Sequence, residues 1–163
     1  MEATRILGID PGFGRMGFGC IETDRSGQIR VLDYGVITTS SQQTFSERLS
    51  DIAVDLRALL TLYKPHLVAM EQLYFAKNVT TGLRVAEARG VVRLLAAEQG
   101  VPIQEHSPSQ IKKALTGHGG AKKQAMQQMI QRMLRLPSLP QPDDAADALA
   151  VAFITSAHAR IIG

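Results

Sequence analysis

The stretch ILGIDPGFGRMGFGC, residues 6–20, decides the fold that we predict for this chain. An apolar run ends on a carboxylate, Asp10, and a Pro-Gly turn follows it directly. Short apolar runs bounded by turn residues are typical of buried strands, so we predict a strand over residues 5–10 with a charge at its carboxyl end. Because Gly12 and Gly14 have no side chain, we interpret them as leaving space for backbone and a phosphate to approach Asp10. Gly17 and Gly19 would keep side chains of the neighbouring strand out of the same space. A tight turn is the alternative that explains Gly12 alone.

The rest of the chain alternates between the periods of strands and helices. Residues 15–24 and 28–38 predict two further strands that continue the first one as an antiparallel meander. Hydrophobic period and turn residues then predict helices over 45–63, 79–99, 121–135 and 143–159, and strands over 66–72 and 101–107. We therefore predict an α/β fold with a mixed five-stranded sheet, three antiparallel strands then two parallel, and helices on both faces. We expect a single domain over residues 1–163.

Composition favours an ordinary globular protein. The chain has 163 residues, of which 45% are hydrophobic and 20% are charged. A run of about 18 apolar residues is missing, which excludes a membrane span, and the first residues do not resemble a secretion signal. A single cysteine, Cys20, excludes an internal disulfide and any zinc site made of several cysteines. We therefore predict a cytoplasmic protein.

Positive charge is concentrated in one part of the chain, although the net charge is only +3. No acidic residue occurs between Glu105 and Asp143. The basic residues of this stretch are Lys112, Lys113, Lys122, Lys123, Arg132 and Arg135. A region of one sign favours an anionic partner such as nucleic acid, and a solvated helix face is the alternative.

Carboxylates occur where they should converge. Asp10 and Glu71 end two predicted buried strands, which places both at the edge where open sheets bind ligands if the strands are parallel neighbours. Asp144 and Asp147 are three residues apart and share one face of the last helix, while Asp143 suits a capping role. Clustered carboxylates must share protons or cations, and Mg²⁺ prefers such oxygen ligands. Since two such ions can clamp a phosphodiester, the residues predict metal-dependent phosphoryl transfer.

Four segments then match a known family. ILGIDPG, VAMEQLYFAKN, EARG and DDAADALAVA resemble the RuvC Holliday junction endonucleases of bacteria, in the RNase H-like superfamily, over residues 5 to about 157. The resemblance implies that Asp10, Glu71, Asp144 and Asp147 are the catalytic and metal-binding residues. It implies Mg²⁺, with two ions per active site and Mn²⁺ able to substitute. It also implies symmetric cuts in a four-way junction, leaving 5′-phosphate and 3′-hydroxyl ends, in homologous recombination and DNA repair.

The same resemblance implies partners and DNA contacts. Two cuts need two active sites, so it implies a homodimer whose contact includes the helix over 79–99, and it implies work with the RuvA-RuvB branch-migration complex. Among the predicted DNA-binding residues, the resemblance supplies Tyr74, Lys112 and Lys123. Position beside them adds Phe75, Lys77, Asn78, Lys113, His118 and Lys122, for which a hydrophobic anchor or a solvated surface is the alternative. Tyr74 aligns with the family's loop aromatic, and stacking of a base on an aromatic ring is worth about 1–3 kcal/mol. Lys122 and Lys123 lie at the start of a predicted helix, where positive charge opposes the helix dipole. We interpret this unfavourable placement as a sign that the helix start and the two lysines face a phosphate.

Three other functions are weighed against this one. A module that binds branched nucleic acid without cutting predicts a missing acid, yet all four are present. A fragment of an actin-like ATPase, suggested by GIDPG, needs two related lobes, and the chain has no internal repeat. An RNase H-like nuclease that acts on RNA or RNA–DNA hybrids fits the same chemistry and remains a minor alternative.

Overall fold

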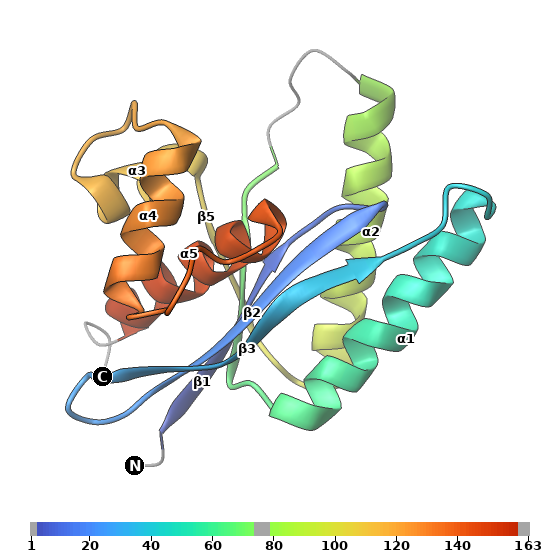
Figure 1. Cartoon of the computed structure of the whole chain (residues 1–163). Helices are drawn as coiled ribbons and strands as arrows, with labels where there is room; N and C mark the ends of the chain where they lie inside the picture. The colour runs from blue at the N-terminus through green and yellow to red at the C-terminus, as the bar shows by residue number, and fades with distance from the viewer. Residues whose placement is uncertain (1–2, 74–78, 160–163) are drawn as a thin grey trace.

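The computed structural model describes residues 3–73 and 79–159, which form a mixed sheet of five strands with helices around it. The strands are β1 (Thr4–Asp10), β2 (Arg15–Thr23), β3 (Ile29–Thr38), β4 (Leu67–Glu71) and β5 (Ile103–His106). They lie in the order β3-β2-β1-β4-β5 (Figure 1). The antiparallel pairs β1–β2 and β2–β3 are followed by the parallel pairs β1–β4 and β4–β5, so the predicted sheet is confirmed.

Helices cover both faces of the sheet. They are α1 (Phe45–Tyr63), α2 (Val79–Glu98), α3 (Pro108–Thr116), α4 (Lys123–Met133) and α5 (Asp143–Ala159). Figure 1 shows α1 and α2 on one side of the strands and α3, α4 and α5 on the other. The predicted helices are confirmed with their ends shifted by at most two residues. No helix in the described ranges is both long enough and apolar enough to cross a membrane.

Helix α3 is not among the elements predicted from the sequence, although its start and end are encoded locally. The Ser107 side chain accepts a hydrogen bond from the Gln110 backbone N–H, and the Gln110 side chain accepts one from the Ser107 backbone N–H. Pro108 occupies the first turn, and Gly117 ends the helix in the left-handed region, with φ 71°. The stretch SPSQ and the later glycine are therefore the signals that could have predicted this helix.

Alternation along β1 decides which residues meet which helices. Leu7 and Ile9 are fully buried in the core beneath α1 and α2, while Ile6 lies in the core formed with α3, α4 and α5. Since side chains alternate along a strand, Gly8 and Asp10 share the face of Ile6. Asp10 is therefore directed to the side of the sheet that α5 covers.

Glycines let α5 approach that side of the sheet closely. A Cβ added at Gly8 would lie 2.0 Å from the carbonyl oxygen of Ala148, and one at Gly17 would lie 2.0 Å from that of Asp144. Both clashes are with the backbone of α5, which cannot move aside as a flexible side chain does. We call this contact, formed by Gly8 and Gly17 against α5, the glycine seam. It determines how deeply the acids of α5 are placed against β1.

Gly12 has a different role from the one that we interpret from the sequence. A Cβ at this position would lie 2.1 Å from the carbonyl oxygen of Arg15, within the same turn. The structure therefore favours the alternative, in which Gly12 is required to close the turn after Asp10.

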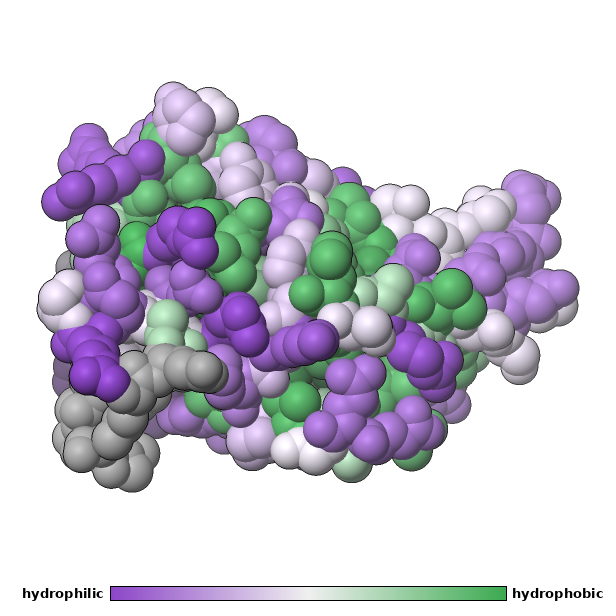
Figure 2. Space-filling model, turned by 90° about the horizontal axis from the view of Figure 1, so that it is seen from below, coloured by the Kyte–Doolittle hydropathy of each residue, from purple (hydrophilic) through white to green (hydrophobic). Residues whose placement is uncertain are grey.

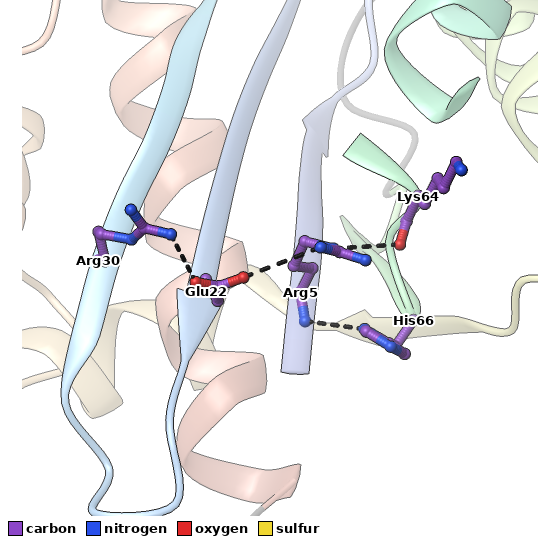
Figure 3. A network of polar contacts seen from close by, with 5 residues as sticks. All are labelled: Arg5, Glu22, Arg30, Lys64 and His66. Atoms are coloured by element: carbon purple, nitrogen blue, oxygen red, sulfur yellow. Dashed lines mark hydrogen bonds and ion pairs between the residues drawn. The ribbon is translucent and has the colours of Figure 1, made fainter. Parts of the chain in front are cut away.

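The opposite end of the sheet carries an ordinary polar surface. Arg5, Glu22 and Arg30 lie side by side on β1, β2 and β3, and Glu22 forms ion pairs with both arginines, at 3.9 and 2.7 Å (Figure 3). His66 Nδ1 accepts a hydrogen bond from the Arg5 backbone N–H at 3.0 Å. Seen from below, hydrophilic side chains surround several small hydrophobic patches (Figure 2). Exposed ion pairs such as these are worth about 0–1 kcal/mol each, so this end has the character of a solvated surface.

Candidate active site

The predicted acids converge at the carboxyl ends of β1 and β4. The parallel register pairs Ile9 with Met70, so the residues that follow, Asp10 and Glu71, end adjacent strands side by side. Both face the side of the sheet on which α5 packs, and α5 brings Asp144 in its first turn and Asp147 one turn later. Strand ends and a helix pressed onto the sheet therefore hold these carboxylates on rigid elements.

The acids raise one another's pKa. Burial raises the pKa of Asp10 to about 8, and the charges of Asp147, Asp144 and Glu71 add to this rise. Burial, followed by the charge of Asp147, also raises the pKa of Glu71. Burial raises the pKa of Asp147 too, against the lowering effect of Lys123. Carboxylates in this situation require a shared proton or a cation.

Lys123 supplies one such cation. Its Nζ lies 2.6 Å from Asp143 Oδ2 and 3.2 Å from Asp147 Oδ2. The hydrogen bond to Asp143 raises the pKa of Lys123 and lowers that of Asp143. Asp147, which has no basic neighbour in the sequence, therefore finds its partner on α4. Lys123 turns toward the acids, and its contact with DNA stays a prediction.

One carboxylate oxygen of the site lacks a hydrogen bond. Arg15 Nε lies 2.9 Å from Asp144 Oδ2, close enough for an ion pair, but the direction of the contact is not that of a hydrogen bond. Oδ2 is buried and accepts no hydrogen bond from the residues that the structure describes. Its negative charge is paired with the Arg15 guanidinium, but its hydrogen-bonding capacity is unused. A bound cation would satisfy this oxygen.

The donor set suits a hard divalent cation. Asp10, Glu71, Asp144 and Asp147 offer only carboxylate oxygens, the ligands that Mg²⁺ and Mn²⁺ take. Within residues 3–73 and 79–159, no group of three Asp, Glu, His or Cys side chains is already spaced around one ion. The chemistry of the donors and the unsatisfied oxygen of Asp144 fit a metal.

A cavity of about 230 Å³ opens beside these acids. Glu71 and Asp147 contribute its negative side, and Lys112 and Lys123 its positive side. The remaining wall is apolar and consists of Pro108, Ile111 and Met126. The charge of Lys112 lowers the pKa of Glu71, against the effect of burial. The arrangement offers lysines for phosphate oxygens next to carboxylates for a metal, which is the chemistry of phosphodiester cleavage.

The structure brings only some of the predicted DNA-binding residues to this cavity. Lys112 and Lys123 line it. Lys113, His118 and Lys122 are exposed on α3, on the turn after it and at the start of α4. The other predicted residues, Tyr74, Phe75, Lys77 and Asn78, lie outside the described residues.

Sequence reasoning missed two arginines beside the turn that follows Asp10. The Arg48 guanidinium lies 4.9 Å from the ring centre of Phe13, a residue of that turn, and the Arg84 guanidinium lies 5.8 Å from it. Arg84 also lies 5.3 Å from the ring of Phe45. Aromatic faces hold guanidinium groups in place without neutralising their charge. These residues come from distant parts of the chain, so no local signal points to the cluster.

The raised pKa of Asp10 predicts how the stability of the metal-free protein depends on pH. The folded state keeps a proton on Asp10 up to about pH 8, whereas the ordinary pKa is 3.8. Between these values the folded state binds more protons than the unfolded state, so the free energy of unfolding should fall as the pH rises. Urea unfolding in EDTA at several pH values measures this slope. Asp10→Asn should flatten it, and an equal slope in both proteins would contradict the prediction.

Comparisons with known proteins match nearly the whole chain to one family of nucleases. The family model described as "Crossover junction endodeoxyribonuclease RuvC" matches residues 6–155. A crossover junction endodeoxyribonuclease RuvC from Roseiflexus sp. (strain RS-1) is 49% identical over 162 residues, which cover 99% of this chain and 96% of that protein. A solved structure of Thermus thermophilus RuvC has 34% identity and a TM-score of 0.89, and the match covers 97% of this chain and 96% of that one.

A second structure was solved with a ligand. It is T. thermophilus RuvC in complex with Holliday junction substrate, and it matches with 31% identity and a TM-score of 0.88 over 97% of this chain and 96% of that one. Fold and sequence thus agree with this family along nearly the entire length. The chain belongs to the RuvC family of crossover junction endodeoxyribonucleases.

Proposed function

We propose that this chain resolves Holliday junctions as a structure-selective DNA endonuclease, by paired, symmetric, metal-dependent nicks in homologous recombination and DNA repair. The observation that carries the proposal is the convergence of Asp10, Glu71 and Asp147 beside Lys112 and Lys123. Membership of the RuvC family supports the four-way junction as substrate. The whole chain, residues 1–163, acts as one nuclease domain in this proposal.

Asp10, Glu71, Asp144 and Asp147 are proposed as the catalytic and metal-binding residues. Mg²⁺ is the proposed ion, with two per site and Mn²⁺ able to substitute, because every offered ligand is a carboxylate. When bound, Mg²⁺ supplies positive charge for the phosphodiester and lowers the pKa of water. The chain's own contribution is to hold the acids on the ends of β1 and β4 and on α5, so that few degrees of freedom remain when the ion and the DNA arrive. The expected products carry 5′-phosphate and 3′-hydroxyl ends.

The proposed DNA surface surrounds these acids. Lys112 and Lys123 line the cavity and can meet the phosphate oxygens nearest the cut, with Lys113, His118 and Lys122 further out. Arg48 and Arg84 offer guanidinium groups beside the turn that follows Asp10. The remaining contacts are proposed from the sequence alone: stacking by Tyr74 and Phe75, and backbone contacts by Lys77 and Asn78.

A homodimer is proposed because paired cuts require two active sites. Helix α2 exposes Val79 by 62%, Leu83 by 54% and Leu94 by 59%, although large apolar side chains usually avoid water. Positions separated by four and eleven residues share one face of a helix, so these three form an apolar ridge on α2. A second copy of the chain that packs on this ridge would bury it.

The double variant Leu83→Glu with Leu94→Glu is expected to be monomeric, because two charges would be buried at the contact. Light scattering during gel filtration measures the mass, and junction cleavage by the variant should lose the pairing of its two cuts. Leu62→Glu is the matched control, since Leu62 is 70% exposed on the neighbouring helix α1. A dimeric double variant, or a control that dissociates equally, would contradict the assignment of the ridge on α2.

Two further assignments come from the family rather than from the geometry. The RuvA-RuvB branch-migration complex is the proposed protein partner, and the cytoplasm is the proposed location. Binding of purified RuvA-RuvB to a junction already occupied by this protein tests the first of these.

The experiment that tests the function uses a labelled synthetic four-way junction, a linear duplex and an RNA–DNA hybrid, each with Mg²⁺ or with EDTA. Paired, symmetric nicks in the junction alone, only with Mg²⁺, are the expected result. Junction binding without cutting in any divalent metal would favour a binding module. Cutting of the hybrid would keep the metal chemistry and overturn the proposed substrate.

A further inference from the structure

Arg89 carries a buried positive charge in the middle of α2. Arg89 is only 8% exposed, which is unusual for arginine because a buried guanidinium must be paired and hydrogen-bonded. Two acceptors satisfy it. Nη1 donates to the main-chain carbonyl oxygen of Glu71, and Nη2 donates to the carboxylate of Glu105 on β5. Arg89 therefore joins α2 to the ends of β4 and β5, next to a proposed catalytic acid.

The contact with the Glu71 carbonyl oxygen fixes the peptide unit between Glu71 and Gln72. Glu71 is the last residue of β4 and pairs with His106 on β5. The next residue, Gln72, donates its N–H to the carbonyl oxygen of His106 at 2.8 Å. With the Glu71 carbonyl held by Arg89 and the Gln72 N–H held by β5, both polar groups of this peptide unit have partners. Rotation of the unit, which would swing the Glu71 side chain away from Asp10, is thereby opposed.

We infer that Arg89 is a positioning residue, which holds Glu71 in the orientation that binds the metal. The inference rests on the proposed role of Glu71 as a ligand. Arg89 does not line the cavity, and its hydrogen bonds reach the Glu71 main chain and Glu105. Its charge also lowers the pKa of Glu71, which the charge-conserving variant Arg89→Lys separates from positioning. Partners that orient a metal ligand from behind typically contribute about 10–100-fold to metal affinity or activity.

Arg93, one turn further along α2, provides a matched control. Its Nη2 donates to the same Oε1 atom of Glu105, at 2.8 Å, and its side chain is 53% exposed. It shares the carboxylate with Arg89 and, among the described contacts, does not reach Glu71. Loss of Arg93 therefore removes a charge from the same ion-pair network and leaves the Glu71 carbonyl held.

The experiment compares Arg89→Met, Arg89→Lys and Arg93→Met in three measurements. These are the single-turnover cleavage rate at saturating junction, the junction Kd in EDTA, and the binding of Mn²⁺ to the DNA-free protein, followed by the paramagnetic resonance of free Mn²⁺. Arg89→Met should lose about 10–100-fold in cleavage rate and in Mn²⁺ affinity, with an unchanged junction Kd. Arg93→Met should match the wild type in all three. Arg89→Lys should show a smaller loss, because its ammonium keeps the charge and can meet one acceptor, although it cannot span both as the guanidinium fork does.

Several results would overturn the inference. One is a folded Arg89→Met protein with wild-type rate and Mn²⁺ affinity, and another is an equal loss in Arg93→Met. If Arg89→Met does not fold, Arg89→Lys decides, since wild-type Mn²⁺ binding by that variant would exclude a positioning role. Glu71→Gln separates this inference from the proposed function. If Glu71→Gln cleaves normally, the role of Glu71 itself fails; if it is inactive while the Arg89 variants are normal, only the role of Arg89 fails.

Discussion

Asp10→Asn is expected to abolish junction cleavage and to leave junction binding intact. The substitution preserves the size of the side chain but replaces one oxygen of a proposed metal ligand by an amide nitrogen, at the centre of the acid cluster where Asp10 interacts with Glu71, Asp144 and Asp147. The loss of rate should exceed the about 10–100-fold typical of residues that only support a metal ligand. The basic residues around the cavity are unchanged, so the affinity for the junction should hold. Single-turnover cleavage and a junction-binding titration in EDTA measure the two effects separately.

Asp55→Asn serves as the control for this experiment. Asp55 is exposed on α1, on the opposite face of the sheet from α5, and its substitution makes the same chemical change away from the acid cluster. It should cleave at the wild-type rate. Wild-type cleavage by Asp10→Asn would remove Asp10 from the active site, and a joint loss of binding and cleavage would assign it a structural role instead.

Gly17→Ala is expected to have the second large effect, on stability and activity together. The added Cβ would lie 2.0 Å from the carbonyl oxygen of Asp144, so α5 must move away from the sheet or the strand must bend. Overpacking of this kind typically costs about 1–3 kcal/mol and occasionally more; a clash with backbone belongs at the upper end. The shift carries Asp144 away from Asp10, so the protein that remains folded should cleave slowly even at low temperature. Urea unfolding and single-turnover cleavage measure the two losses.

Gly119→Ala is the matched control for the glycine seam. No atom lies within 4 Å of a Cβ at Gly119, and its backbone is outside the left-handed region. This variant should unfold at the wild-type urea concentration. Normal stability and cleavage in Gly17→Ala would show that α5 does not depend on a bare backbone at this position.

The fold could be predicted because its strong signals are local. The apolar run before Asp10 and the long apolar period of residues 45–63 are each sufficient to identify an element, and both are confirmed. Helix α3 escaped because it has only nine residues and buries only Ile111 and Leu115, too few to show a period. Its capping residues were the usable signal, and capping marks the ends of a helix more clearly than apolar spacing marks so short a body.

Part of the candidate site could also be predicted from local sequence, whereas the rest depends on contacts between residues that are distant in the chain. The positions of Asp10 and Glu71 at strand ends follow from the pattern of each strand and from the confirmed parallel pairing. The partner of Asp147 could not be predicted, because Lys123 reaches it from another helix. From the sequence, the charge of Lys123 at a helix start pointed only to a phosphate, whereas packing directs it to carboxylates. Arg89 stood within the EARG segment, but nothing in the sequence says which carbonyl a buried guanidinium will meet.

The glycine seam also has a consequence for the evolution of this enzyme. A methyl group at Gly8 or Gly17 meets main-chain carbonyl oxygens, so no exchange of side chains on α5 can make room for it. A lineage that lost either glycine would need to displace α5 or bend the strand, and either change would alter how Asp144 and Asp147 are placed against β1. If Asp144 and Asp147 have the proposed catalytic roles, intermediates along that route are expected to lose activity, so selection would remove them before a compensating change arose. Variation is therefore expected to accumulate on the outer surfaces of the helices, while the seam is inherited unchanged.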